Sequence, residues 1–258
     1  MQYQGGKSRI SRYITEVIVN EVSRWEITHS QTNSSCDFRE RESNALVSLF
    51  CGACSVETKL APYFEKVICN DNHEYLIALL DGVKNGYQLP DDISEEEYNY
   101  VKNHKDDDKI LAGFVGFGSS FGGKWFGGYG RSKKYTLKRR SHAKESKNAL
   151  MRDSQHWGNV EFICKDYKDV IIPDNAIIYA DPPYNNTTNY RNIKFDSDEF
   201  WDYAREVSKN HLMFISELEA PDDFVSIWER PVTRTLDRNK NNQFKSVEKL
   251  FVHILHTT

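Results

Sequence analysis

The sequence has no apolar run long enough to cross a bilayer, and residues 1–25 lack the charged-then-apolar order of a secretory signal. We therefore expect a cytoplasmic protein that does not enter membranes. Its five cysteines are an odd number, which does not suit a disulfide framework, so we expect reduced thiols. The net charge of −4 gives no global sign of a nucleic-acid partner, so any basic surface has to be local.

Several motifs for nucleotides and metals are also missing. No GxGxxG occurs, and Gly5-Gly6-Lys7 lacks the upstream strand and the first glycine of a P-loop. Cys51 and Cys54 have CxxC spacing, but a zinc site needs a second pair, and none is present. A redox pair is the alternative, in a weak context. We interpret both cysteines as small, semi-buried residues in a tight turn, and we expect no metal.

The chain does contain an alternation of strand-like and helix-like segments. Strands are expected at residues 45–50, 66–70, 161–164, 176–180 and 211–216, with two more near 224–228 and 249–255. Helical spacing of apolar residues is clear at 8–25, with Ser8 as N-cap, and at 197–208. This alternation predicts an α/β fold with a doubly wound, mostly parallel sheet. Residues 86–158 break the alternation and predict an inserted subdomain within a main domain of residues 1–85 and 159–258.

The stretch Asp181-Pro182-Pro183-Tyr184 follows the apolar run at 176–180. The prolines stiffen the backbone, so the Asp181 carboxylate and the Pro182 carbonyl are held at a strand's carboxyl end, where α/β sheets place their ligands. Two rigid acceptors beside the aromatic face of Tyr184 suit the exocyclic amine of a nucleobase. They would grip both N–H bonds and free the nitrogen lone pair for attack. The alternative is an ordinary turn that ends a buried strand.

Other strand ends suit an adenosine-bearing cofactor. The first strand runs into small residues at 50–55, which would let a ligand approach the backbone, and Asp71 follows at a spacing that suits ribose hydroxyls. Asp166 could accept from the adenosine amine or be an exposed turn residue. Lys7 could serve the cofactor's carboxylate or simply start the helix. Without a polyphosphate motif, S-adenosylmethionine fits, because an amine can attack its activated methyl group with neither a metal nor a covalent intermediate.

A basic segment lies inside the predicted insertion. Ten Lys or Arg residues fall between Lys124 and Arg152 against the single Glu145, directly behind a glycine- and aromatic-rich run. Such a concentration predicts contacts with nucleic-acid phosphates, although a solvated surface helix is the alternative. A base within a duplex would have to be flipped out to reach Asp181. The candidate DNA-binding residues are Lys124, Arg131, Lys133, Lys134, Lys138, Arg139 and Arg140.

These motifs together resemble a known family. YQGGK at 3–7, LFCGACSVE at 49–57 and DPPY at 181–184 look like the ordered motifs of the D12 (Dam-like) class of adenine-specific DNA methyltransferases. GSSFGGKWFGGYGR and FISELEAP look like its phage and prophage branch. The resemblance covers nearly the whole chain, with residues 26–44 least matched. It implies a seven-stranded Rossmann-like methyltransferase sheet, with residues 86–158 as a target-recognition subdomain. It also implies methyl transfer from S-adenosylmethionine to N6 of a flipped-out adenine in double-stranded DNA, by a bacterial or phage-encoded enzyme. We favour a monomer, and the sequence leaves open whether the enzyme serves restriction-modification, protection or regulation.

The resemblance also assigns residues. The catalytic residues it implies are Asp181, Pro182, Pro183 and Tyr184. The cofactor-binding residues it implies are Tyr3, Gly5, Gly6, Lys7, Phe50, Cys51, Gly52, Ala53, Ser55, Asp71, Asp166, Tyr167 and Asp181. One departure is Cys54, which stands where the family loop often has its second glycine. If that position requires a positive φ, cysteine costs roughly 1 kcal/mol there.

Other functions stay open from the residues alone. N4-methylation of cytosine uses the same amine chemistry, and an RNA substrate is a further alternative. A protein that is not an enzyme is another alternative, namely a catalytically inactive DNA-binding regulator on the same scaffold. The intact DPPY motif argues against it, because DNA binding alone does not need that motif. A small-molecule N-methyltransferase is disfavoured by the basic segment.

Overall fold

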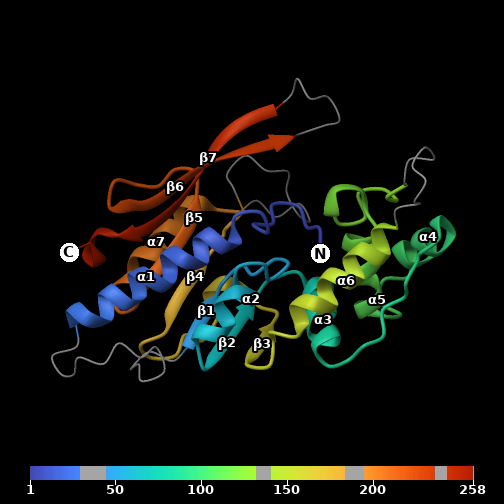
Figure 1. The fold of residues 1–258 in the computed structure, drawn as a ribbon, viewed down its shortest axis with the longest axis horizontal. Helices are drawn as coiled ribbons and strands as arrows, with labels where there is room; N and C mark the ends of the chain where they lie inside the picture. The colour runs from blue at the N-terminus through green and yellow to red at the C-terminus, as the bar shows by residue number, and fades with distance from the viewer. Residues whose placement is uncertain (30–44, 132–140, 184–194, 236–242, 258) are drawn as a thin grey trace. The chain divides into compact units, whose positions relative to one another are not determined.

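The structure is a computed structural model, which describes residues 1–29, 45–131, 141–183, 195–235 and 243–257. Its described strands form one mixed sheet in the order β3-β2-β1-β4-β5-β7-β6 (Figure 1). The strands are β1 (Ala45–Ser48), β2 (Lys66–Asn70), β3 (Val160–Ile163), β4 (Ile177–Ala180), β5 (Met213–Glu217), β6 (Phe224–Thr235) and β7 (Gln243–His253). Parallel pairing joins β1 to β4, β2 to β3 and β4 to β5, whereas β7 runs antiparallel to β5 and β6. The predicted α/β fold with its seven-stranded, Rossmann-like sheet is confirmed.

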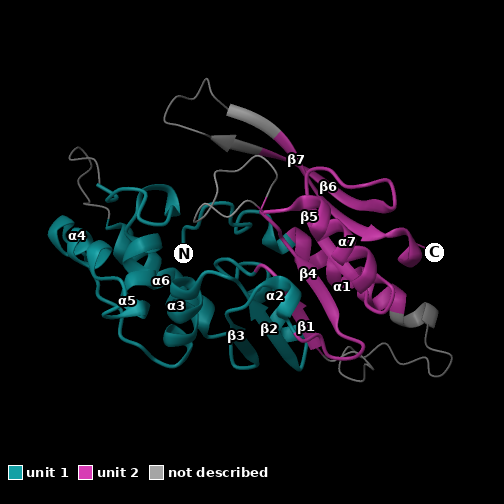
Figure 2. Ribbon diagram, turned by 180° about the vertical axis from the view of Figure 1, so that it is seen from behind, with its two compact units in different colours: residues 1–12, 51–170 teal, residues 13–50, 171–258 magenta. Residues whose placement is uncertain are grey.

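Helices connect these strands. They are α1 (Ser11–His29), α2 (Glu57–Leu60), α3 (Glu74–Lys84), α4 (Glu95–Asn103), α5 (Lys109–Gly113), α6 (His142–Ser154) and α7 (Ser197–Ser208). The chain divides into two compact units, which Figure 2 colours separately. Unit 1 comprises residues 1–12 and 51–170, and unit 2 comprises residues 13–50 and 171–258.

Unit 1 contains β2, β3 and the helices α2 to α6. Helix α3 packs against α5 and α6 (Figure 1). Helix α4 begins with a capping box, in which the Ser94 hydroxyl accepts from the Glu97 N–H and the Glu97 carboxylate accepts from the Ser94 N–H. Its acidic face is solvated, because Glu96 and Glu97 are exposed while Tyr98 is buried. The boundaries of an insertion at 86–158 remain a prediction.

Aromatic side chains form much of the core of the segment that follows α5. Phe114 and Phe117 are fully buried in a turn of π-helix at Phe114–Gly118. The Trp125 ring stacks on Tyr75 with 5.1 Å between ring centroids, and it lies 4.9 Å from Phe117. Phe121, by contrast, is 52% exposed. The glycine- and aromatic-rich run is therefore largely a packing element, from which one large ring projects.

Unit 2 contains β1, β4 to β7 and α7. Strand β4 is fully buried, because it pairs with β1 on one side and β5 on the other. Helix α7 starts after Asp196, whose carboxylate accepts from two backbone N–H groups, and it buries Phe200, Trp201 and Ala204 on one face. Its observed bounds are those predicted from the spacing of its apolar residues.

Two expected elements differ from the sequence prediction. Helix α1 begins at Ser11 rather than after an N-cap at Ser8, and the Ser8 carbonyl instead accepts from the Ser11 hydroxyl. Strands β6 and β7 are longer than the short segments expected at 224–228 and 249–255. Strand β6 includes Pro231, which has no N–H to donate to a ladder. It is tolerated because β6 lies at the edge of the sheet.

Cys51 and Cys54 are more buried than the semi-buried turn we expected. Cys51 and Cys54 are buried, and the Cys54 Sγ lies 3.5 Å from the Sγ of Cys69, which is also buried. Burial raises the pKa of the Cys51 thiol to about 12 and also raises the pKa values of Cys54 and Cys69. Thiols kept protonated in this way are poor nucleophiles, which favours packing over redox chemistry.

This burial predicts a pattern of thiol reactivity. In the native protein, Ellman's reagent should react rapidly with the exposed Cys164, while Cys51, Cys54 and Cys69 react only after denaturation. The double variant Cys36→Ser, Cys164→Ser should therefore show no fast phase at pH 8. A fast phase that persists in this variant would identify a reactive thiol in the CxxC turn and contradict the packing interpretation.

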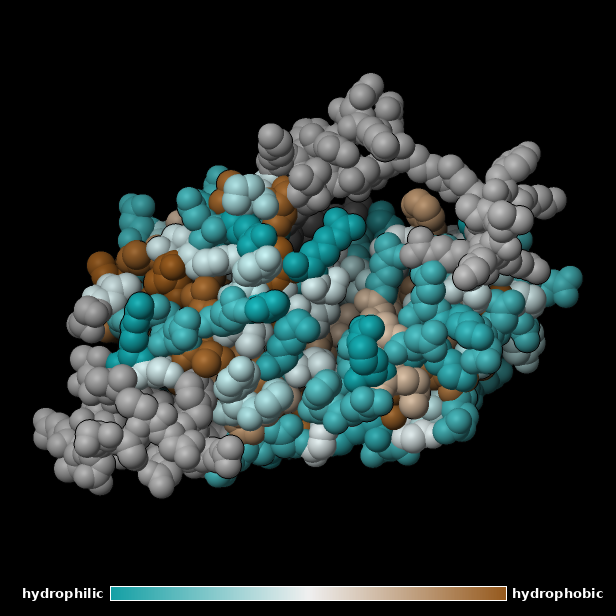
Figure 3. All heavy atoms as spheres, viewed as in Figure 1, coloured by the Kyte–Doolittle hydropathy of each residue, from teal (hydrophilic) through white to brown (hydrophobic). Residues whose placement is uncertain are grey.

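The surface differs between regions. Hydrophilic side chains dominate over α4 and α6 on the face shown in Figure 3. Large hydrophobic side chains that are exposed in unit 2 include Val225, Ile254 and Leu255. None of the described helices is long and apolar enough to span a membrane.

Candidate active site

Three of the predicted cofactor residues meet in unit 1, at the carboxyl end of β2. The Gly52 N–H donates to Asp71 Oδ2 at 3.1 Å, which ties the loop after β1 to the residue after β2. The Tyr3 ring covers the same loop, since a Cβ added to Gly52 would lie 3.0 Å from Tyr3 Cε1. The N-terminal motif, the small-residue loop and Asp71 therefore form one cluster.

Asp71 is the charged group of this cluster. Besides the Gly52 bond, its Oδ1 accepts from the His73 N–H at 2.9 Å. Burial raises the pKa of Asp71 to about 6, although both backbone donors favour the ionised form and act in the opposite direction. A carboxylate fixed by two N–H groups at a strand end is a rigid acceptor for ligand hydroxyl groups.

The loop after β1 has a positive φ at Cys54, the position where the family often has its second glycine. Gly52 has φ +50° and Cys54 has φ +58°. Cys54 thus occupies the left-handed region, which costs a residue with a Cβ roughly 1 kcal/mol. The complete burial of its side chain beside Cys69 offsets this cost, because burying an apolar group of that size stabilises the fold by about the same amount.

The segment that follows β3 is held in place by Asn70, a residue that the sequence analysis did not single out. The buried Asn70 donates through its Nδ2 to the Lys165 carbonyl at 3.1 Å and accepts through its Oδ1 from the Lys165 N–H at 3.0 Å. This pair of bonds fixes the segment after β3 against the end of β2. Asp166 follows Lys165 but is exposed, and its Oδ1 accepts from the Lys168 N–H. This contact is that of a turn aspartate, the alternative considered above, while Tyr167 is buried.

The remaining residues of the N-terminal motif start the first helix. Gly5 has φ +80°, which glycine adopts without strain. Lys7 is buried, and its backbone carbonyl accepts from the N–H groups of Ile10 and Ser11. Lys7 thus does start the turn that leads into α1, and its contact with a cofactor remains a prediction.

The predicted catalytic motif belongs to unit 2. Asp181 follows β4 directly and is half-buried, Pro182 is buried and Pro183 is exposed, while Tyr184 lies outside the described residues. Beneath them, the Tyr179 and Ser216 hydroxyls share a hydrogen bond of 3.0 Å between β4 and β5. The motif thus follows a fully buried strand that is hydrogen-bonded to its neighbour, so the backbone that leads into Asp181 is held rigidly.

Phe50, another predicted cofactor residue, also lies in unit 2. Its ring packs edge-on against Phe195 and Phe200, with both centroid distances at 5.8 Å. Phe200 projects from α7, so this contact joins the segment after β1 to α7. The Phe50 side chain is half-buried, and its contact with a cofactor remains a prediction.

Comparison with known proteins decides the family. A model of the D12 class of N6 adenine-specific DNA methyltransferases matches residues 3–111 and 123–225, which is most of the chain. The chain belongs to this family. The matched residues include the N-terminal motif, the loop after β1, Asp71 and the DPPY motif. The protein is therefore an S-adenosylmethionine-dependent methyltransferase, and the assignment of DNA as its substrate rests on the family match.

Solved structures add little to this. PH1948 of Pyrococcus horikoshii, provisionally described as an RNA methyltransferase, is 8% identical with a TM-score of 0.39, and the match covers 93% of this chain and 84% of that one. The tRNA methyltransferase TrmI of Aquifex aeolicus is 10% identical with a TM-score of 0.34, over 90% and 68% of the two chains. Likenesses this weak carry no argument here. No curated protein matches the sequence.

The cluster in unit 1 fits the methyl donor of this methyltransferase. The half-buried Asp71 carboxylate offers acceptors to a pair of hydroxyl groups, and it lies beside the Gly52 backbone, against which the Tyr3 ring packs. The Tyr3 ring adds an aromatic face. Among the described residues, no group of His, Cys, Asp or Glu is arranged to hold a metal ion.

The predicted DNA-binding residues are only partly within the described residues. Lys133, Lys134, Lys138, Arg139 and Arg140 lie outside them. Lys124 is exposed, whereas Arg131 forms an ion pair with Glu95 on α4. Lys147 likewise pairs with Asp91 at 2.8 Å. Neutralisation by acidic neighbours was not visible in the sequence, since Arg131 and Glu95 lie 36 positions apart.

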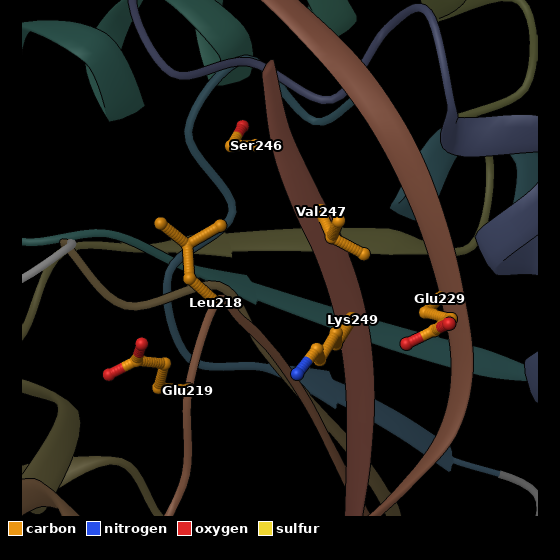
Figure 4. A pocket seen from close by; sticks show the side chains of 6 residues that line it. All are labelled: Leu218, Glu219, Glu229, Ser246, Val247 and Lys249. Atoms are coloured by element: carbon orange, nitrogen blue, oxygen red, sulfur yellow. The ribbon is translucent and has the colours of Figure 1, made fainter. Parts of the chain in front are cut away.

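An open hollow of about 400 Å³ lies on the β6–β7 side of unit 2. Figure 4 shows its lining residues, which are Leu218, Glu219, Glu229, Ser246, Val247 and Lys249. Glu229 and Lys249 are cross-strand neighbours on β6 and β7. Two carboxylates against one ammonium do not suit a phosphate group, and none of the predicted site residues lines this hollow.

Proposed function

We propose that the Asp181 carboxylate and the Pro182 carbonyl hold the N6 amine of the target adenine. The observation that carries this proposal is the position of Asp-Pro-Pro directly after the buried β4. Prolines restrict both their own φ and the residue before them, so the two acceptors keep a fixed direction. Accepting from both N–H bonds favours a pyramidal nitrogen, whose lone pair can then attack.

The cofactor side is assigned in the same way. Asp71, held by the Gly52 N–H, would accept from the ribose hydroxyls of S-adenosylmethionine, and the Tyr3 ring, which lies against Gly52, would offer the ligand an aromatic contact. The bound cofactor supplies an electrophilic methyl group. The chain's part is to orient the donor and the amine and to exclude water between them, which removes much of the entropic barrier. Tyr184, if it stacks on the adenine, adds a contact of about 1–3 kcal/mol.

The DNA side rests on the segment at 86–158, which we assign as the target-recognition subdomain. Its basic residues, including Lys124, would contact phosphates of double-stranded DNA, and the target adenine would be flipped out of the duplex. Arg131 would have to exchange Glu95 for a phosphate, which weakens its net contribution. A monomeric enzyme of phage or prophage origin, acting in the bacterial cytoplasm within restriction-modification, is the setting that the sequence motifs favour.

The reaction product tests this proposal. Purified protein is incubated with duplex DNA and S-adenosylmethionine tritiated on the methyl group, and the DNA is digested to nucleosides. We expect label in N6-methyldeoxyadenosine, confined to a sequence-specific subset of adenines because base contacts set specificity. Single-stranded DNA and RNA of the same sequence serve as matched substrates and should accept much less label.

Each other outcome has a definite meaning. Label in N4-methyldeoxycytidine would overturn the choice of adenine while keeping the amine chemistry. Tight, salt-sensitive DNA binding with no transfer of label would indicate the inactive DNA-binding regulator instead. Binding that does not respond to salt would contradict the assignment of phosphate contacts to the basic segment.

A further inference from the structure

A glycine of the predicted insertion lies directly against the N-terminal motif, within unit 1. Gly123 is buried and has φ +67°. A Cβ at this position would lie 2.5 Å from the Gln2 carbonyl oxygen and 2.8 Å from Tyr3 Cα. Both are backbone atoms, so no side-chain rotation can relieve the clash. The Gly123 carbonyl in turn accepts from the Gln4 N–H at 3.2 Å.

The contact continues through aromatic side chains to the cofactor loop. The Tyr3 ring packs on Phe117 with 5.2 Å between centroids, and Phe117 is fully buried in the π-helical turn. On its other side the Tyr3 ring lies against Gly52, whose N–H donates to Asp71. A displacement of Tyr3 would therefore be transmitted to the loop and to the carboxylate that the cofactor uses.

The turn that carries Gly123 is itself anchored to helices of the insertion. The Ser120 and Tyr98 hydroxyls share a hydrogen bond of 2.9 Å, and the Tyr98 oxygen also accepts from the Gly128 N–H at 3.1 Å. The Ser146 hydroxyl of α6 donates to the Gly118 carbonyl at 2.9 Å. The path from α4 and α6 to Tyr3 is thus continuous and mostly buried.

We infer that Gly123 is a positioning residue of the cofactor site: by letting the insertion approach the backbone at Gln2 and Tyr3, it holds the Tyr3 ring against Gly52 and thereby sets the affinity for S-adenosylmethionine. The inference rests on the proposed role of Tyr3, Gly52 and Asp71 in binding this cofactor. It gives the predicted insertion at 86–158 a second role, in which its residues Gly123 and Phe117 pack against Tyr3 and support the cofactor site.

The neighbouring glycine provides a matched control. Gly122 has φ +70°, nearly the same as Gly123, but a Cβ on Gly122 would meet no atom within 4 Å. Alanine at either position carries the same backbone penalty for a positive φ. Only alanine at 123 pushes on the N-terminal motif, so the difference between the two variants isolates the contact.

The test measures cofactor affinity by isothermal titration calorimetry with S-adenosylmethionine alone. Gly123→Ala should raise the Kd at least tenfold, whereas Gly122→Ala should change it less than twofold. In steady-state assays the KM for the cofactor should rise in Gly123→Ala while kcat at saturating cofactor stays within twofold of wild type. A merely structural defect would lower kcat or the folded fraction instead.

A double-mutant cycle shows whether the effect passes through Tyr3. In a Tyr3→Ala background, Gly123→Ala should add less than a twofold change in Kd, because the ring that it displaces is gone. Should Gly123→Ala fail to fold, Phe117→Leu removes the other support of the Tyr3 ring. It should raise the Kd several-fold in the wild-type background and not in Tyr3→Ala.

The outcomes separate the two proposals. Equal Kd values for Gly122→Ala and Gly123→Ala, or an undiminished effect in the Tyr3→Ala background, would overturn the positioning role while the proposed function stands. Failure of the wild-type protein to bind S-adenosylmethionine would contradict the proposed cofactor site itself.

Discussion

Asp181→Asn should lower the rate of methyl transfer by about a thousandfold or more while leaving DNA affinity within a few-fold of wild type. The amide keeps the shape of the side chain but presents at most one acceptor oxygen, and its NH2 group would oppose the N–H bonds of adenine. Loss of one preorganised polar contact to a reacting group typically costs 10²- to 10³-fold, and here the attacking nitrogen is also left unactivated. Single-turnover transfer of labelled methyl to DNA measures the effect.

Asp174→Asn is the matched control. Asp174 is exposed and precedes β4, whereas Asp181 follows it, so the two changes remove equal charge at opposite ends of one strand. We expect wild-type transfer from Asp174→Asn. Because DNA binding does not require the Asp181 carboxylate, band-shift affinities of both variants should match the wild type. Substantial turnover by Asp181→Asn would remove this residue from the mechanism.

Asp71 should make cofactor binding depend on pH. Burial raises its pKa to about 6 in the absence of ligand, and hydroxyl groups donate much more strongly to the ionised carboxylate than to the neutral acid, in which one oxygen carries a proton. The Kd for S-adenosylmethionine should therefore be constant above pH 7 and rise about tenfold per pH unit below about 6, the slope for uptake of one proton. Calorimetric titrations between pH 5 and 8 measure this.

The variant Asp71→Asn tests whether Asp71, rather than another titrating group, causes this pH dependence. It replaces charge-assisted hydrogen bonds, worth about 1.5–3 kcal/mol, by neutral ones, so the Kd for S-adenosylmethionine at pH 7.5 should rise roughly 10- to 100-fold. The variant should also show a flat profile down to pH 5.5, where the wild type already weakens. A parallel pH dependence in wild type and Asp71→Asn would mean that another group governs binding.

The same pKa has the opposite consequence for the folded chain without cofactor. A folded-state pKa raised above the unfolded value of about 3.9 means that the neutral form is preferred in the fold. The contribution of Asp71 to the free energy of unfolding is therefore fully present below about pH 4 and is lost as the pH rises through about 6. The site thus keeps a buried charge that costs stability at neutral pH, which is typical of residues retained for binding.

Much of the scaffold could be predicted because it is encoded locally. The bounds of α7 follow from Phe200, Trp201 and Ala204 at helical spacing after an Asp cap, and β2 follows from a short β-branched run that ends at a polar residue. The end of β4 follows from Asp-Pro-Pro, whose backbone can continue neither strand nor helix. These segments need few partners to specify their conformation, so their residue order was sufficient.

Contacts between distant segments could not be predicted in the same way. The pairing of Arg131 with Glu95, the extension of β6 past Pro231 at a sheet edge and the burial of Asp71 each depend on what packs alongside. The glycine-rich run was visible in the sequence, but nothing local indicated that Gly123 would lie against Tyr3.

The sequence by itself determined which strands exist, where the stiff Asp-Pro-Pro corner ends one of them, and which family the ordered motifs resemble, since each depends on neighbours along the chain. Only the tertiary structure decided that Tyr3, Gly52 and Asp71 meet, that Cys54 takes a left-handed conformation and that Gly123 lies against the backbone of Gln2 and Tyr3. The physical reason is that close approach and desolvation are properties of packed surfaces, and packing joins residues that the sequence keeps far apart.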